Sequence, residues 1–118
     1  MLVTGSGQPS LLDNLNNNFP GIFVREFMVT SFDVKKGKPN PEPYLTALNK
    51  GRLKPNEAIV IENAPLGVEA AHNAGLFTVA VNTGPLPDSI LIDAGADILF
   101  PSIKTLCVEW ENLFNYLS

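Results

Sequence analysis

The sequence predicts an α/β fold with a parallel sheet. Short apolar runs of the kind that form buried strands alternate along the chain with amphipathic segments of the kind that form helices. The chain has 118 residues, the size of one small domain, and 45% of them are hydrophobic, which is enough for a buried core. Because ligands of parallel sheets bind at the carboxyl ends of the strands, those ends are where functional side chains are expected.

The first half of the chain is expected to form two strands and two helices. The strands are predicted at residues 1–4 and 27–30, and the helices at residues 9–15 and 41–50. For the second helix, Asn40 suits the N-cap and Pro41 the first helical position, where the missing N–H of proline has no partner to lose. Gly51 suits the C-cap of the same helix.

The second half is expected to form three strands and two helices. The strands are predicted at residues 58–61, 77–81 and 97–100, and the helices at residues 66–74 and 102–117. The last helix has an apolar face that we expect to pack in the core, formed by Ile103, Leu106, Cys107, Trp110, Leu113, Phe114 and Leu117. Strands that alternate with helices predict right-handed crossovers between parallel strands.

The composition argues against several partners and compartments. The net charge is -4 and no run of Lys and Arg is present, which disfavours nucleic acid and anionic membranes as partners. No apolar stretch approaches the ~20 residues that span a bilayer, and the N-terminus lacks the pattern of a signal peptide. The single cysteine, Cys107, excludes an internal disulfide and is typical of a reducing compartment, so we expect a cytoplasmic protein.

Two segments carry groups that suit an anion. The first predicted strand ends at Thr4 and is followed by Gly5, Ser6 and a helix start, where hydroxyls and free N–H groups can bind a phosphate. The alternative is a small polar turn without a ligand. The second segment places Lys38 directly before three prolines within residues 39–43. These prolines either hold Lys38 against the charge of a phosphoryl group or form a rigid surface turn.

A third segment carries groups that suit a cation. The strand at residues 58–61 runs directly into Glu62 and Asn63, whose carboxylate and amide oxygens are ligands that Mg²⁺ accepts. A carboxylate at the end of a buried strand is costly unless it has a partner. The alternative is that one of these side chains caps the following helix, and Asn63 could do so while Glu62 faces a metal.

Together these segments resemble the haloacid dehalogenase-like superfamily, and within it the β-phosphoglucomutase-like phosphatases and phosphomutases. The matching positions are Thr4, the run Gly37-Lys38-Pro39-Asn40-Pro41-Glu42, Glu62, the run Gly67-Val68-Glu69-Ala70-Ala71, and Ala74-Gly75. The resemblance spans nearly the whole chain. It implies a three-layer, Rossmann-like core domain built on a parallel sheet.

The resemblance also implies a role for each matching residue. The Thr4 hydroxyl and the Gly5 N–H would bind the phosphoryl group. Lys38 would neutralise charge on that group and on an aspartyl-phosphate intermediate, which makes Lys38 the expected catalytic residue. Glu62 and Asn63 would lie at a Mg²⁺ site, so Mg²⁺ is the expected cofactor. Asn63 departs from the family, which usually has Asp there, and its amide oxygen would bind a metal without charge.

A second departure is the absence of an Asp-x-Asp motif, which carries the nucleophile of the family at the end of its first core strand. That strand and the helical cap domain of the family both precede the position where this sequence begins. We therefore expect residues 1–118 to be the C-terminal part of a core domain that lacks the nucleophile strand and the cap. The missing strand would lie between the strands that end at Thr4 and Glu62. Either that segment or a second copy of the chain would cover the open sheet edge.

The functional hypothesis is that the chain is part of a Mg²⁺-dependent phosphatase or phosphomutase that acts on small phosphorylated metabolites. By itself the chain is expected to be inactive, because the nucleophile segment is missing. The alternative is a non-catalytic, degenerate module that binds phosphate or a partner. The missing motif and Asn63 favour this alternative, whereas the intact motif around Lys38 favours an enzyme. Without a cap, neither the substrate nor the choice between phosphatase and mutase follows from the sequence.

Overall fold

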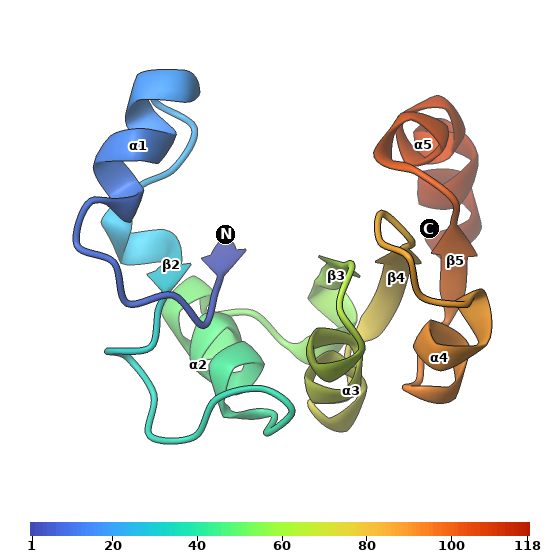
Figure 1. Cartoon of the computed structure of the whole chain (residues 1–118), viewed down its shortest axis with the longest axis horizontal. Coiled ribbons are helices and arrows are strands. Elements are labelled where there is room, and N and C mark those ends of the chain that lie inside the picture. The colour runs from blue at the N-terminus through green and yellow to red at the C-terminus, as the bar shows by residue number, and fades with distance from the viewer.

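The computed structural model describes residues 1–118 and has an α/β architecture of three layers, as predicted (Figure 1). Helices α1 (Leu11–Asn18) and α5 (Ile103–Leu117) lie on one side of the strands. Helices α2 (Glu42–Gly51), α3 (Pro65–Asn73) and α4 (Asp88–Asp93) lie on the other side. The strands between them are β1 (Leu2–Val3), β2 (Met28–Val29), β3 (Ile59–Glu62), β4 (Phe77–Val81) and β5 (Ile98–Phe100). Two short 3-10 helices are η1 (Arg25–Phe27) and η2 (Pro55–Glu57).

The strands are divided between two sheets. β1 pairs with β2, and β3, β4 and β5 pair in that order; every pair is parallel, as the sequence predicts. β1 and β3 do not pair with each other, although they are neighbours across the middle of the molecule (Figure 1). Helices α2 and α3 contact each other beside this gap, so the helix layer joins the two halves. None of the helices has both the length and the apolar character needed to cross a membrane.

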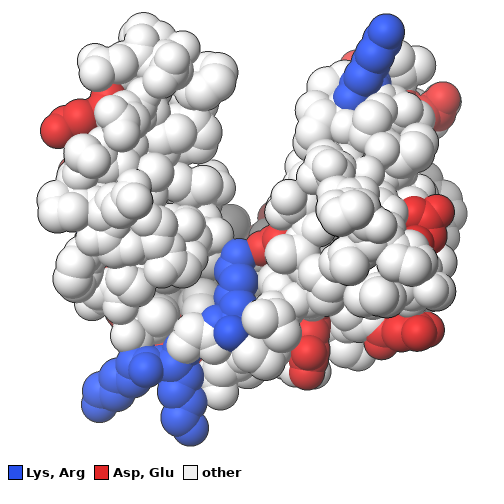
Figure 2. Space-filling model, viewed as in Figure 1, with Lys and Arg blue, Asp and Glu red and all other residues white.

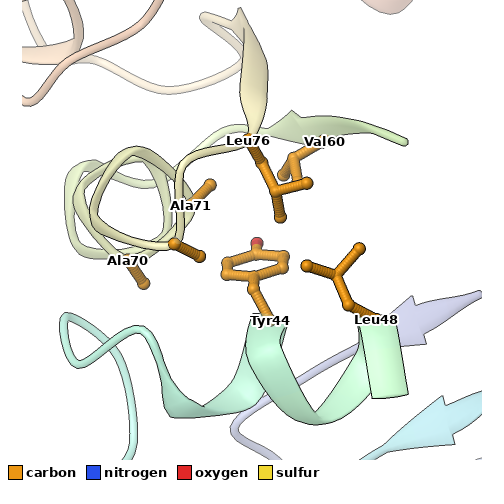
Figure 3. Packing of buried hydrophobic residues seen from close by; sticks show 7 residues of the cluster. Tyr44, Leu48, Val60, Ala70, Ala71 and Leu76 are labelled. Carbon is orange, nitrogen blue, oxygen red and sulfur yellow. The ribbon is translucent and has the colours of Figure 1, made fainter. Parts of the chain in front are cut away.

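A cluster of apolar side chains from α2, α3 and β3 forms the core at this junction (Figure 3). Tyr44 and Leu48 extend from α2, and Ala70 and Ala71 face them from α3. Because the alanine side chains are small, the Tyr44 ring fits between the two helices in the middle of the cluster. Val60 packs against the cluster from β3. The junction therefore depends on one large ring set among small neighbours.

The last helix has the predicted extent, but the prediction for its apolar face is mostly wrong. Leu106 and Leu113 are buried against β4. The other members of the predicted face are exposed to a considerable degree, and Cys107, predicted as a core residue, is exposed. The physical reason is that α5 packs on a sheet of three strands. Leu106 and Leu113 pack on this surface, whereas Trp110, Phe114 and Leu117 line an open pocket that also includes Phe77 of β4.

Some helix ends also differ from the prediction. Pro41 immediately precedes α2 instead of opening it, and Arg52, not Gly51, takes the left-handed conformation after the helix, with φ of 53°. Gly75 has φ of 75° after α3, which suits a glycine that ends a helix. Helix α4 is not predicted, because its six residues are too few to show a helical period.

A partly exposed ionic cluster around Asp33 fixes the chain between η1, β2 and α2. One carboxylate oxygen accepts hydrogen bonds from Arg25 Nη2 at 3.2 Å and Lys50 Nζ at 3.0 Å. The other accepts from the Thr30 N–H at 2.7 Å and the Thr30 hydroxyl at 2.9 Å. The hydrogen bond from the Thr30 N–H holds the pKa of Asp33 well below its usual range. Burial acts in the opposite direction, and the hydrogen bonds from Lys50 and Arg25 lower the pKa further. Both cations also donate to the carbonyl oxygen of Met28 in β2.

We predict that Asp33→Asn lowers the free energy of unfolding at pH 7 by about 1 to 2 kcal/mol, because charge-assisted hydrogen bonds are lost. A depressed carboxyl pKa stabilises the fold above the unfolded-state pKa of about 3.9, and this contribution is lost as the pH falls towards the folded pKa. The difference between wild type and Asp33→Asn should therefore shrink below about pH 4 in urea titrations. Asp13→Asn on α1 is the control, because Asp13 is exposed and has no ion pair. A difference that is constant from pH 7 to pH 3 would contradict the prediction.

Candidate functional site

Lys38 lies at the point where the two halves of the molecule meet. Its ammonium donates to the carbonyl oxygen of Val3 at 3.2 Å, at the end of β1, and to a carboxylate oxygen of Glu62, at the end of β3. These contacts bring together residues that are far apart in the sequence, as the strand-end argument predicts. Figure 2 shows a deep notch between the two halves, with basic and acidic side chains meeting at its floor.

The loop that carries Lys38 is fastened to the start of α2. The Glu42 carboxylate accepts hydrogen bonds from the N–H groups of Lys35 at 2.8 Å and Lys36 at 2.9 Å. These bonds lower the pKa of Glu42, and the bond from Lys35 has the largest effect. Partial burial raises the pKa but does not outweigh them. The Asn40 side chain accepts a hydrogen bond from the Glu42 N–H at 2.9 Å, although the residue at the N-cap position is Pro41 and not, as was predicted, Asn40. The peptide bond after Lys38 is cis.

Glu62 is fully engaged in hydrogen bonds. Its Oε1 accepts from Lys38 and from the Tyr44 hydroxyl, the latter at 2.8 Å. Its Oε2 accepts from the N–H groups of Asn63 at 3.1 Å and Ala64 at 3.3 Å. Burial raises the pKa of Glu62, but the bonds from Lys38 and Tyr44 outweigh it, so the pKa is lowered overall. The carboxylate is therefore charged and acts as the counter-ion of Lys38.

The Glu62 carboxylate lies directly against Gly67, where a larger residue would have to displace it. A Cβ atom at Gly67, in the first turn of α3, would overlap the carboxylate carbon and both of its oxygens. The glycine of the Gly67-Val68 motif thus leaves the space in which Glu62 reaches Lys38.

A cavity of about 200 Å³ contains the three predicted phosphate-binding residues. Its lining is Thr4, Gly5, Ser31, Val34, Lys35, Gly37, Lys38 and Pro43. The Thr4 hydroxyl accepts a hydrogen bond from the Ser6 N–H at 3.1 Å, which leaves its own proton for a ligand.

Sequence reasoning missed Ser31 and Lys35, which line the same cavity. Ser31 follows β2 closely, and β2 is the parallel neighbour of β1. The rule that pointed to Thr4 therefore applies to the next strand, and it would have found Ser31. No comparable pattern in the sequence indicates Lys35, which lines the cavity because of the path that the loop before Lys38 takes.

The predicted metal ligands, Glu62 and Asn63, make hydrogen bonds to other groups of the chain. The Asn63 amide donates to the Thr83 hydroxyl at 3.1 Å, which leaves its carbonyl oxygen as a possible ligand. Both Glu62 oxygens already accept hydrogen bonds, and no group of three or more His, Cys, Asp or Glu side chains is placed to hold a metal. Mg²⁺ takes six oxygen ligands in near-octahedral geometry and usually keeps several waters among them, so Asn63 and Glu62 could supply only part of such a set.

An apolar groove of about 370 Å³ separates β1 from β3. Its lining is Met1, Leu2, Val3, Tyr44, Ala47, Leu48, Leu53, Glu57, Ala58, Ile59, Val60, Ile61, Glu62 and Leu76. β1 pairs with β2 alone, and β3 with β4 alone, so each presents a free strand edge towards the groove. The carboxyl ends of both strands lie at the Lys38–Glu62 pair.

Fold and site together define a parallel α/β domain with a pocket at its strand ends that is lined mostly by polar residues and glycine. The chain belongs to the haloacid dehalogenase-like hydrolase family, whose profile matches residues 2–81. It is similar to a solved Bacteroides vulgatus protein described as a candidate β-phosphoglucomutase, with 62% identity and a TM-score of 0.94 over 99% of this chain and 47% of that one. This places it in the phosphatase and phosphomutase group of the family.

Several relatives of known name are phosphatases or phosphomutases. Validoxylamine A 7'-phosphate phosphatase of Streptomyces hygroscopicus subsp. limoneus is 32% identical over 94% of this chain and 50% of its own length. Hexitol phosphatase A of Escherichia coli is 36% identical over 69% of this chain and 37% of its own length. β-Phosphoglucomutase of Bacillus subtilis is 29% identical over 85% of this chain and 47% of its own length. The chain thus spans about half the length, or less, of these relatives.

We predict that Gly67→Ala destabilises the fold, although alanine normally favours a helix by up to about 1 kcal/mol over glycine. The new methyl group would displace the Glu62 carboxylate from Lys38 and Tyr44, and the loss should be about 1 to 3 kcal/mol in thermal or urea unfolding. Gly84→Ala is the control, because a Cβ there meets open space. If Gly67→Ala is as stable as Gly84→Ala, the role assigned to Gly67 is wrong.

Proposed function

We propose that this chain is the phosphate-binding part of a phosphatase or phosphomutase that acts on small phosphorylated sugars. The observation that carries the proposal is the cavity shared by Thr4, Gly5 and Lys38 at the carboxyl ends of the strands. The names of the relatives support the substrate class, since they include phosphatases of a hexitol and of a validoxylamine phosphate and a phosphoglucomutase.

Each residue of the cavity has a distinct part in this proposal. The Thr4 hydroxyl and the Gly5 N–H donate hydrogen bonds to phosphoryl oxygens. Lys38 supplies the positive charge that offsets negative charge on the phosphoryl group, most of all when a bond to phosphorus breaks. Lys38 is the catalytic residue of this set, because the other groups bind and orient.

The nucleophile and most metal ligands have to come from outside the described residues. We propose that an extended segment occupies the groove between β1 and β3 and pairs with both strand edges, which would place its own carboxyl end beside Lys38. A carboxylate at that end is positioned to attack a phosphoryl group bound at Thr4. Mg²⁺ binding is proposed only for the assembled site, with Asn63 as one ligand and Glu62 as another if its present hydrogen bonds rearrange.

A non-catalytic phosphate-binding module is the second candidate function. Asn63 in place of an acid favours it, as does the occupation of both Glu62 oxygens by other partners. In this alternative the cavity around Thr4 binds a phosphate group without catalysing its transfer or hydrolysis. The two candidates share the phosphate cavity and differ in whether an added segment restores turnover.

We predict that inorganic phosphate binds the pure chain and that Lys38→Ala weakens this binding about tenfold or more, because one charge-assisted contact is worth at least that factor. Titrations followed by ³¹P NMR or calorimetry measure the affinity. Lys36→Ala is the matched control: Lys36 lies two residues away but does not line the cavity. Equal losses in the two variants would show that net charge, not the cavity, binds the anion.

We further predict that a synthetic peptide with a run of Val and Ile and a terminal Asp-x-Asp binds the groove as a parallel strand. Amides of β1 and β3 should then exchange more slowly with solvent in NMR experiments, because the added strand pairs with both edges. A peptide of the same length in which Pro replaces one residue in the middle of the run is the control, since proline cannot donate to the ladder. Mg²⁺ titration and phosphatase assays of the assembled complex separate the enzyme from the binding module. Equal protection by both peptides would refute strand pairing.

A further inference from the structure

Tyr44 connects the apolar core to the charged pair at the strand ends. The residue is 5% exposed and lies in the middle of the cluster that joins α2 and α3 (Figure 3). Packing alone would be served equally well by phenylalanine at this position. A hydroxyl buried to this extent is costly unless it has a partner, so its contacts indicate why tyrosine is present.

The side chain of Tyr44 contacts both members of the ion pair. Its hydroxyl donates to Glu62 Oε1 at 2.8 Å, the same oxygen that accepts from Lys38. The Lys38 ammonium also lies 5.1 Å from the centre of the Tyr44 ring, within the range of a cation–π contact. One rigid side chain therefore fixes the carboxylate through its tip and the ammonium through its face.

We propose that Tyr44 is a positioning residue that keeps Lys38 at the phosphate cavity by holding Glu62 in place. The inference rests on the function proposed above, because it assigns Lys38 to a phosphate. Two donors share Glu62 Oε1, so the Tyr44 hydroxyl helps to fix the position of the carboxylate to which the Lys38 ammonium is bound. The ring restricts the flexible lysine stem, which lowers the entropy lost when a phosphate binds.

The structure offers variants that separate the hydroxyl, the ring and the packing. Tyr44→Phe removes the hydroxyl and keeps the ring. Tyr44→Leu removes both and keeps an apolar side chain. Leu48→Val is the matched control, because Leu48 is one turn further along α2 in the same cluster and contacts neither ion.

Two measurements on the full chain test the proposal. The affinity for inorganic phosphate should fall about threefold to tenfold in Tyr44→Phe, which is less than the value of a direct hydrogen bond to a charged group because the hydroxyl acts on the phosphate only through Glu62 and Lys38. The affinity should fall further in Tyr44→Leu. The NMR signals of the Lys38 Cε protons report the aromatic ring current; they should move in Tyr44→Phe and lose the ring-current shift in Tyr44→Leu. Leu48→Val should lower the melting temperature while the phosphate affinity and the Lys38 signals stay at wild-type values.

The two measurements test the proposed function and the positioning role of Tyr44 independently. If the wild-type chain does not bind phosphate, the proposed function fails, but the Lys38 signals still test the positioning role. Lys38 signals that are unchanged in both Tyr44 variants would overturn the proposal. So would a Leu48→Val variant that loses as much phosphate affinity as Tyr44→Phe, since packing alone would then explain the effect.

Discussion

The ion pair between Lys38 and Glu62 is the contact on which the arrangement of the molecule depends, because it lies where the two sheets meet. Lys38 reaches the end of β1, and Glu62 is the last residue of β3. A largely buried carboxylate is costly unless its oxygens accept hydrogen bonds. Both oxygens do so here, one from Lys38 and Tyr44 and the other from main-chain N–H groups before α3. The pair therefore constrains the loop, α2 and α3 together.

The helix layer supplies the stability that the strands do not provide between the two halves. β1 and β3 share no hydrogen bonds, so no backbone ladder connects the halves. Tyr44 and Leu48 pack instead against Ala70 and Ala71, and this apolar contact lies next to the ion pair. The small residues of α3 serve both contacts: the alanines admit the Tyr44 ring, and Gly67 admits the Glu62 carboxylate. Small side chains at these positions are thus a packing requirement.

The sequence is sufficient to predict the elements that follow local rules. Strands and helices have distinct periods, and parallel strands end at one edge, so the approach of Thr4, Lys38 and Glu62 could be predicted without a structure. Contacts between side chains of different elements follow no such rule, so neither the Asp33 cluster nor the bond between Tyr44 and Glu62 can be predicted from the sequence pattern. Burial of α5 was over-predicted for a related reason. An apolar stripe shows which face of a helix is apolar but not how wide a surface covers it.

Because both Glu62 oxygens already accept hydrogen bonds, the predicted phosphate site and the predicted Mg²⁺ site differ in which ligands they still need. A phosphate needs a hydroxyl, N–H groups and one cation, and the cavity around Thr4 and Lys38 offers all of these within this chain. A Mg²⁺ ion needs six oxygens, and among the predicted ligands the carbonyl oxygen of Asn63 is the one that accepts no hydrogen bond. Phosphate recognition can therefore follow from the folding of this chain, whereas metal binding requires oxygen ligands from solvent or another segment.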